Sequence, residues 1–540
     1  MLFRSFIINQ LFSDESEVQR YAAMMRDVAR LVVEEYDGSL KAEHGTGRNM
    51  APFVEYEWGK EAFAAMRELK EIFDPHYLLN PGVIFNDDPE CFIKHFKPLP
   101  ELKMRGLDAP IAPEGDRHDS VRETVKGVLK ANKCIECGFC EVNCLTCGLT
   151  LSSRQRIVIQ REISHLRETG SNPKRLATLV KQYRYQGDQT CAGDGLCATS
   201  CPMKINVADL THLVRQEALP QGSMGYKTGQ FAARHFAGIK SGLRLVLDTA
   251  RLGHNVLGSN AMKGIAGAMH KTGLPLWTPA MPGKTHQPRA GRVYSRYSIK
   301  RDESQALKVV YFPSCINQTM GLSKGSPVKH SLVDEMVLLC AKAGYEVIFP
   351  EGLEKMCCGT IWESKGMLDI ADQKTAELDE ALWQASEQGK YPVVCDQSPC
   401  LHRLRKCIKR MKLYEPVEFI WEYLRERLEF TPIDRHVALH FTCSTREMGL
   451  VDKMTSLARL CSNNVFLPEG VGCCGFAGDR GWTHPEVNRW ALRKLRKQLV
   501  DNNIEMGYSN SRTCEVGLET NGGIPYQSII YLVNEVTRPK

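Results

Sequence analysis

The chain has 540 residues, a formal net charge of +7 and 43% hydrophobic residues, which is typical of a globular protein with several packed cores. Charged residues make up 25% of it, which excludes a mostly disordered or collagen-like chain. We find neither a run of about 18 apolar residues nor a signal-peptide pattern. The 21 cysteines gather in short spacings, whereas disulfide scaffolds usually belong to small secreted domains. These features favour metal or iron–sulfur binding in a reducing, cytoplasmic compartment.

Residues 1–98 predict part of a mixed α/β domain. Residues 2–11 are apolar and β-prone, and a helical pattern follows Ser13. A second apolar stripe at helical spacing ends before Asp74. One strand and two helices cannot close a sheet core, so we expect this domain to be incomplete.

Residues 99–125 read as a polar linker, and residues 126–215 carry the first dense group of cysteines. Four of them follow the spacing C-x2-C-x2-C-x3-C: Cys134, Cys137, Cys140 and Cys144. This run wraps a cubane [4Fe–4S] cluster, and its fourth cysteine reaches a neighbouring cluster. Zinc sites instead show two separated pairs. We therefore predict a helical, ferredoxin-like domain with two clusters.

A second run repeats this template, with an aspartate at the second position: Cys191, Asp194, Cys197 and Cys201. One cluster should then take Cys134, Cys137, Cys140 and Cys201. The other should take Cys144, Cys191 and Cys197, with Asp194 or solvent on the fourth iron. A carboxylate is a harder ligand than a thiolate, so this site is either labile or holds a three-iron cluster. Alternatively, Asp194 is only a turn residue.

Residues 216–302 form a basic segment. Within it, residues 223–300 hold twelve Lys or Arg and one acid, a net charge of +11. Apolar residues alternate with these bases, which suits an anionic membrane surface on the cytoplasmic side. The alternative is a solvated helical linker that covers the acidic remainder. We expect no nucleic-acid contact, because no nucleic-acid motif accompanies the charge.

The C-terminal part repeats once, over residues 303–430 and residues 431–540, and both copies predict α/β structure. Each copy has an isolated cysteine, an adjacent pair before glycine and a distant cysteine. The first set is Cys315, Cys357, Cys358 and Cys400; the second is Cys443, Cys473, Cys474 and Cys514. These thiolates predict an iron–sulfur cluster, of the cubane or a non-cubane type, or a thiol redox pair; the alternative is structural zinc. Gln397 and Ser511 stand where related patterns have another cysteine, and Cys395 or His440 could substitute.

Together, CIECGFC, SSRQRI, CAGDGLCATSCP and the paired CCG repeats resemble the iron–sulfur half of bacterial FAD-linked D-lactate dehydrogenases. The segments DGSLKAEHGTGRNMAPF and IFDPHYLLNPGVI resemble the end of the substrate domain in that flavoenzyme family. The resemblance implies a multidomain α+β protein. It would combine a partial FAD-linked oxidase C-terminal domain, a helical dicluster domain and two α/β CCG repeats.

The resemblance also implies roles for a few residues. Glu43 would bind a divalent metal that orients the hydroxyacid, and His44 would be the general base. Residues 80–82 (Asn80, Pro81 and Gly82) would approach the flavin ring. The family places its FAD-binding domain upstream of this stretch, so FAD and the divalent metal require a completing domain, in another chain or missing. We expect the chain alone to be inactive.

Two functions remain open at this point. In the first, a D-2-hydroxyacid such as D-lactate reduces FAD, and electrons pass through the clusters to a quinone or cytochrome. In the second, the chain is a flavin-free iron–sulfur electron-transfer subunit of a glycolate, glycerol-3-phosphate or lactate oxidation complex. The segment EHGTGR argues for the first function, because a pure electron carrier does not need it.

Overall fold

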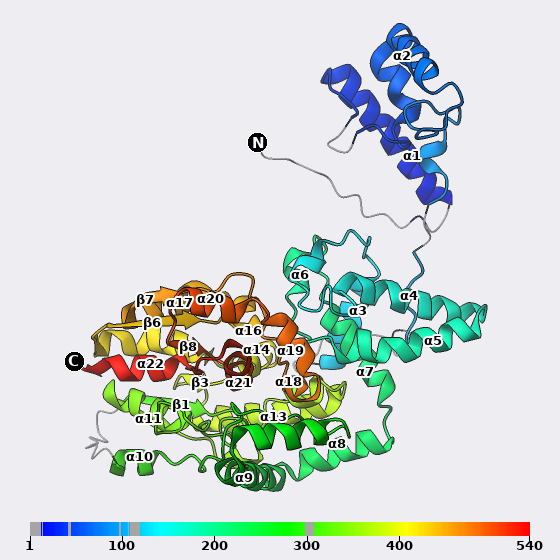
Figure 1. Ribbon diagram of the computed structural model, residues 1–540. Coiled ribbons are helices and arrows are strands. Elements are labelled where there is room, and N and C mark those ends of the chain that lie inside the picture. Colours follow the sequence, from blue (N-terminus) through cyan, green and yellow to red (C-terminus); the bar gives the residue numbers. More distant parts are fainter. Residues whose placement is uncertain are drawn as a thin grey trace. The chain divides into compact units, whose positions relative to one another are not determined.

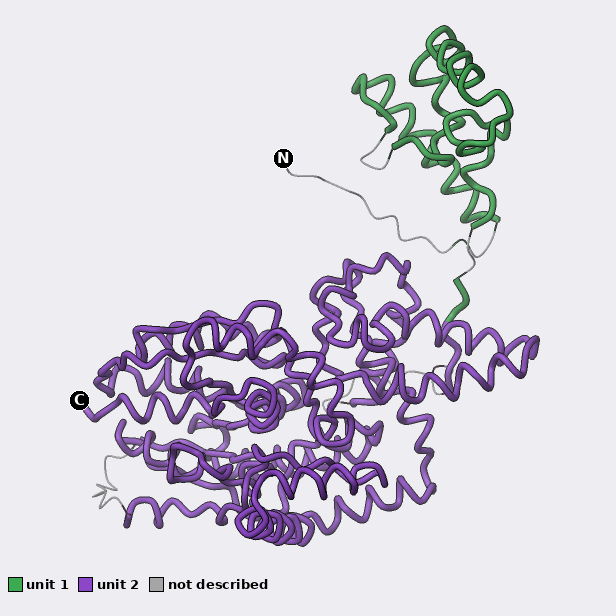
Figure 2. Tube along the Cα trace, viewed as in Figure 1, with its two compact units in different colours: residues 1–101 green, residues 102–540 purple. Residues whose placement is uncertain are grey.

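The computed structural model describes residues 12, 15–41, 45–96, 99–105, 107, 119–296 and 307–540. The chain forms two compact units, residues 1–101 and residues 102–540 (Figure 2). The second unit contains both four-stranded sheets (Figure 1). It also contains most of the cysteines.

The first unit is helical where it is described. Its helices are α1 (Glu15–Arg30, continued by a π-helical turn at Leu31–Glu35), a 3-10 turn at Ala51–Phe53, α2 (Val54–Phe73) and a 3-10 turn at Cys91–Ile93. Ala22 and Met25 of α1 are buried with Phe92 in a small core. Leu69 and Phe73 of the predicted apolar stripe are 57% and 78% exposed. The predicted strand at residues 2–11 lies outside the described residues.

Short helices form the segment that carries the ferredoxin-like cysteines, residues 126–215, which we call the dicluster segment. The helices in and just before it are α3 (Ser120–Ala131), α4 (Ser153–Thr169), α5 (Pro173–Tyr183), α6 (Cys197–Ser200) and α7 (Val207–Ala218), with a 3-10 turn at Phe139–Asn143 and a π-helical turn at Arg184–Gln189. Ser152 caps α4, and Gln155 returns a bond to the Ser152 backbone. Helix α3 begins at Ser120, so regular structure starts within the stretch that the sequence assigns to a linker.

The basic segment is also helical. It contains α8 (Met224–Arg234), α9 (Phe236–His270) and α10 (Ala290–Arg296). Gly258 interrupts α9 with φ 77°, a left-handed conformation that glycine adopts without a Cβ penalty, and the helix kinks there.

Each C-terminal copy folds around a four-stranded parallel sheet. The first contains β1 (Leu307–Phe312), α11 (Leu332–Lys342), β2 (Tyr345–Ile348), a 3-10 turn at Leu353–Lys355, α12 (Thr360–Glu363), α13 (Leu368–Ala385), β3 (Val393–Cys395), α14 (Ser398–Cys407), β4 (Leu413–Tyr414) and α15 (Pro416–Phe419). Irregular turns at Ile420–Leu424 and Arg425–Arg427 and strand β5 (Leu428–Phe430) lead to the second copy. That copy contains β6 (Ile433–Leu439), α16 (Cys443–Glu447), α17 (Val451–Cys461), β7 (Ser462–Phe466), α18 (Arg480–Thr483), α19 (Pro485–Ala491), α20 (Leu495–Asp501), β8 (Met506–Ser509), α21 (Arg512–Gly522), β9 (Tyr526–Ser528), α22 (Ile529–Val536) and β10 (Thr537–Pro539).

The two sheets have the same topology. Their strand orders are β2-β1-β3-β4 and β7-β6-β8-β9, so in each the second strand along the chain lies at one edge and the first beside it. One apolar core joins the copies: Val309 and Tyr311 of β1 share it with Val437 of β6 and Ile529 of α22. Strand β10 returns to pair with β5. This common topology supports a duplicated α/β unit, and the shared core packs the two copies as one body.

Candidate redox site

The first ferredoxin-like set of cysteines converges around two short turns. Cys134 follows α3, and Gly138 (φ 85°) starts the turn that carries Cys140. Burial raises the pKa of Cys140, and the neighbouring Cys201 and Cys137 thiols add to the rise. Burial also raises the pKa of Cys134, which interacts with Cys140. The structure thus brings together the four residues predicted for one cluster.

The second set lines a small pocket. Cys144, Cys191, Asp194 and Cys197 all face it, together with Arg156. The pKa of Cys197 rises well above its usual value through burial and the neighbouring Asp194, Cys191 and Cys144. The pocket is therefore built from the donor set predicted for the other cluster.

Arg156 is a buried positive charge in this pocket. Its guanidinium lies 3.7 Å from Cys144 Sγ and donates to Gly187 O (2.6 Å) and Thr146 Oγ1 (3.1 Å). Burial opposes ionisation of Cys191, yet Arg156 and Arg215 lower its pKa below the ordinary thiol value. A thiolate is the form that binds iron, so this charge prepares Cys191 as a ligand. The sequence pointed to SSRQRI only as part of a resemblance and gave Arg156 no role.

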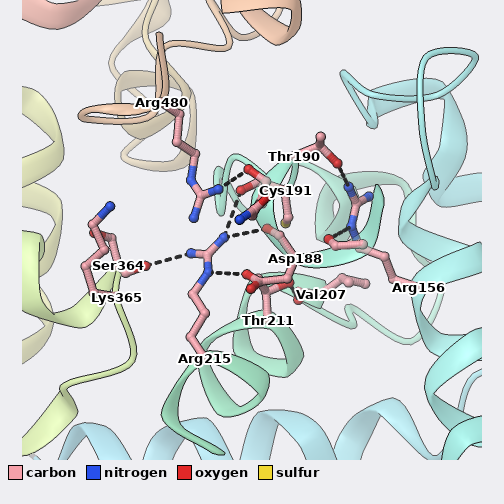
Figure 3. Close-up of polar contacts among 12 residues, drawn as sticks. Arg156, Asp188, Thr190, Cys191, Val207, Thr211, Arg215, Ser364, Lys365 and Arg480 are labelled. Carbon is pink, nitrogen blue, oxygen red and sulfur yellow. Dashed lines mark hydrogen bonds and ion pairs between the residues drawn. The ribbon is translucent and has the colours of Figure 1, made fainter. Parts of the chain in front are cut away.

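Arg215 connects the dicluster segment to the first repeat. It donates to Asp188 Oδ1 (2.6 Å), to Cys191 O (3.2 Å) and to Ser364 O in the loop after α12 (2.7 Å) (Figure 3). Arg480 of the second repeat donates to Gln189 O beside it. Both repeats therefore hold the π-helical turn that leads to Cys191.

Asp194 points toward the second repeat. Its Oδ1 accepts from Leu196 N–H (3.2 Å), while its other oxygen has no hydrogen-bond partner within the described residues. Burial raises the pKa of Asp194, and the Cys473 thiol beside it acts in the opposite direction. A Cβ on the next residue, Gly195, would lie 2.0 Å from Glu447 Oε1, so glycine permits this close approach. The carboxyl group thus lies between the dicluster pocket and the cysteines of the second repeat.

The cysteines of the first repeat form a contiguous set that we call the first cysteine group: Cys315, Cys357, Cys358 and Cys400. Three of them are buried, and Cys315 is partly buried. Cys357 contacts Cys315 and Cys358, and burial together with these thiols raises its pKa well above the usual value. Cys358 contacts Cys357 and Cys400, which lower its pKa well below that value. The four thiols are therefore linked through direct contacts.

The equivalent residues of the second repeat form the second cysteine group: Cys443, Cys473, Cys474 and Cys514. Cys474 Sγ lies 3.1 Å from Cys514 Sγ. Cys443 lowers the pKa of Cys473, but Cys474 and burial raise it, and the net shift is well upward. All eight predicted cysteines thus gather as two sets of four.

The positions without cysteine and the alternative ligands differ from the eight cysteines in their partners. Gln397 Nε2 donates to Ser511 Oγ (2.7 Å), so the positions at which the sequence lacks cysteine pair with each other across the two repeats. Burial lowers the pKa of His440 to about 3, and its Nδ1 lies 3.2 Å from Ser509 Oγ. Cys395 is buried beside Cys358 and Cys400 and remains a possible ligand by position.

The described residues contain no cluster of three or more His, Cys, Asp or Glu placed to hold a single metal ion. Thiolate donor sets of this kind suit either an iron–sulfur cluster or zinc.

The first unit holds the flavoenzyme-like motifs. Glu43 and His44 lie outside the described residues. Asn80 (φ 47°) and Gly82 (φ 77°) form a tight turn, and Arg48 Nε donates to Pro81 O (2.9 Å). Arg48 belongs to the segment EHGTGR and Pro81 to the segment NPG. These two segments, far apart in sequence, are therefore neighbours in the folded unit.

Comparison with protein families matches three separate segments. Residues 5–84 match the C-terminal domain of FAD linked oxidases, residues 130–205 the 4Fe-4S dicluster domain, and residues 437–519 the cysteine-rich CCG domain. The third match covers the second repeat, and the common sheet order of the first repeat extends the likeness to it.

Curated relatives match over parts of their length. The glycolate oxidase subunit GlcD of Bacillus subtilis is 35% identical over 75 residues, 14% of this chain and 16% of that protein. The D-2-hydroxyglutarate dehydrogenase of Xanthomonas citri pv. viticola is 36% identical over 81 residues, 14% of this chain and 17% of that protein. The Escherichia coli D-2-hydroxyglutarate dehydrogenase is 27% identical over 220 residues, 34% of this chain and 20% of that protein. The chain thus spans about a fifth or less of these relatives, and its three domain matches support an iron–sulfur oxidoreductase of the FAD-linked hydroxyacid dehydrogenase type.

Proposed function

We propose that this chain is the iron–sulfur part of a flavin-linked dehydrogenase that oxidises D-lactate or a related D-2-hydroxyacid. Electrons would leave the flavin, pass through the dicluster segment and the two cysteine groups, and reach a quinone or cytochrome. The observation that carries this proposal is the contact between Asp194, in the dicluster pocket, and Cys473 of the second cysteine group.

The surroundings of this contact suit electron transfer. Cys197, Cys473 and Cys474 are buried, so water is largely excluded from the path between the pocket and the second group. Arg156, Arg215 and Arg480 hold the backbone around Cys191 in place. When bound, the clusters would supply one-electron chemistry. We assign one cluster to Cys134, Cys137, Cys140 and Cys201, and the other to Cys144, Cys191, Cys197 and, as a fourth ligand or neighbour, Asp194.

The first unit would contribute to the hydroxyacid site. We assign Glu43 to a divalent metal and His44 to proton abstraction, with Asn80, Pro81 and Gly82 facing the flavin. Arg48 supports this arrangement because it holds the turn at Pro81. The exposed Leu69 and Phe73 support a missing neighbour on α2, and a flavin-holding domain beyond these 540 residues would cover them.

The test is anaerobic purification followed by assay of iron, acid-labile sulfide and flavin. D-Lactate, glycolate and D-2-hydroxyglutarate are then added in turn while the visible spectrum is recorded. Bound flavin and bleaching by one of these acids would support the dehydrogenase. Iron below four atoms per chain, the content of one cubane cluster, would contradict the whole proposal.

The second candidate is an iron–sulfur electron-transfer subunit without its own substrate chemistry. It is favoured by the division of the chain, since the dicluster segment and both repeats form one compact unit separate from the flavoenzyme-like motifs. Ample iron and sulfide without flavin, reducible by dithionite but by none of the three acids, would select this function.

A further inference from the structure

Helix α9 exposes an apolar face. Leu245, Leu252 and Val256 recur at helical spacing and are 67%, 64% and 74% exposed, and Val246 and Leu257 beside them are also mostly exposed. The one acid in residues 241–257 is Asp248, whose side chain is 46% exposed and is paired with Lys284. A contiguous apolar surface of this kind on a soluble unit indicates an interaction site.

The basic residues of α9 that precede the kink at Gly258 turn inward. Lys240 is 3% exposed, and its Nζ donates to Gln318 Oε1 (2.6 Å). Arg244 donates to Gln318 O (2.7 Å), and Arg251 to Leu322 O (2.7 Å). These bonds fix the orientation of this part of α9, because rotating the apolar face inward would leave the three cations and the buried Gln318 carbonyl group without these partners.

Exposed cations lie along the chain on either side of this apolar stretch. Lys227 and Arg234 precede it on α8, and Lys263 and Lys271 follow it beyond the kink at Gly258. Asp248 is the one acid among residues 223–300, and Lys284 pairs with it (2.6 Å). Along the chain, exposed cations therefore flank the apolar stretch on both sides.

We propose that the outward face of α9, with these four cations, binds the interface of an anionic lipid bilayer. Apolar side chains would enter the acyl boundary, and the lysine and arginine heads would meet lipid phosphates. Charge favours lipid over a second copy of this surface, since two copies would bring like charges together. Within the described residues no helix is long and apolar enough to cross a bilayer, so the contact lies along the surface. This inference rests on the surface of α9 and goes beyond the redox function.

The test is co-sedimentation of the full, iron-loaded chain with vesicles of phosphatidylglycerol and phosphatidylcholine. The variant Leu245→Gln/Leu252→Gln/Val256→Gln should bind vesicles roughly tenfold or more weakly. The reason is that it removes three apolar side chains that would be buried in the bilayer. Val180→Gln/Val500→Gln, at apolar residues exposed on α5 and α20, is the matched control and should bind as the parent does. Iron content and reduction by dithionite should stay unchanged in both variants, which separates this test from that of the redox function.

Three results would overturn the proposal. The parent chain could fail to sediment with anionic vesicles at low salt. The triple variant could bind them as well as the control does. Sedimentation velocity could show a dimer of the parent and a monomer of the triple variant without vesicles, which would assign the face to a second copy instead.

Discussion

The two cysteine groups have the same residues in the same order, but different charged side chains lie beside them. Next to the first group is a buried lysine: Lys240 Nζ bonds Gln318 and lies 3.4 Å from Leu353 O, and burial lowers its pKa to about 8 while Cys315 and Cys357 oppose that shift. Next to the second group are a buried acid, Asp194, and Arg446, which interacts with Cys443 and Cys473. Similar cysteine patterns therefore lie in different electrostatic surroundings.

Lys240 and Asp194 should shift the reduction potentials of the two cysteine groups in opposite directions. A nearby cation stabilises the more negative, reduced state of a redox centre, and a nearby acid stabilises the oxidised state. If the proposed clusters bind, Lys240 should therefore raise the potential of the first group, and Asp194 should lower that of the second.

The largest expected effect comes from removing one thiol in each repeat. Cys358→Ser should remove iron from the first group alone, and Cys474→Ser from the second alone, because a hydroxyl is a poor ligand for iron–sulfur clusters. Iron and sulfide assays on each variant measure this, with Cys147→Ser, at an exposed thiol, as the control. Equal iron loss and identical spectra in both variants would indicate one centre shared by the two groups.

The contact between the repeats is the next test. Gln397→Ala should destabilise the protein by about 2 kcal/mol, because it removes the bond to Ser511 Oγ and leaves the buried Arg512 backbone N–H without its acceptor. Urea unfolding measures the change. Gln384→Ala, which removes an exposed bond to Glu380, should cost less than about 0.5 kcal/mol. Equal midpoints for the two variants would show that the repeats do not depend on this bond.

A buried carboxyl group at a helix cap gives the first repeat a pH-dependent contribution to stability. Glu415 caps α15, and burial raises its pKa to about 7, whereas Ser528 caps the equivalent helix α22. Because the folded pKa exceeds the unfolded value, this group stabilises the fold at low pH, and the contribution is lost as pH rises through about 7. Glu415→Gln should remove about 1–2 kcal/mol of this pH dependence between pH 5 and pH 8. Thermal unfolding at both pH values measures it, and an unchanged pH profile would refute the assignment.

The smallest expected effect concerns potential. Lys240→Met should lower the midpoint potential of the first group by on the order of 50 mV, and Asp194→Asn should raise that of the second. Redox titration followed by electron paramagnetic resonance measures both. Lys263→Met, at an exposed position of the same helix, should leave both potentials unchanged. Midpoint potentials that shift in the same direction in Lys240→Met and Asp194→Asn would contradict the opposite effects expected of these two side chains.

Local spacing was enough to predict much of this arrangement. The cysteine runs lie in short helical turns, and the doubled CCG pattern corresponds to two sheets of one topology. Contacts between distant segments were not predictable. Nothing in the sequence near Gln397 indicates its bond to Ser511, and Arg215 looks like an ordinary helical base until its partners Asp188 and Ser364 are known.

In the basic segment, too, the contacts that orient the side chains were not predictable from the sequence. Composition predicted an amphipathic surface, but charge counts cannot say which way a cation points. The carbonyl groups of Gln318 and Leu322 decide that, since they draw Arg244 and Arg251 inward.

The first cysteine group lies beside the inner side of α9, since Lys240 of that helix interacts with Cys315 and Cys357. The same helix that presents Leu245 and Val256 outward extends this lysine inward toward Cys315 and Cys357. A helix with its side chains is about 10 Å across. An electron acceptor dissolved in a bilayer on that face would thus be separated from the thiolates by little more than one helix, without any need to enter the protein.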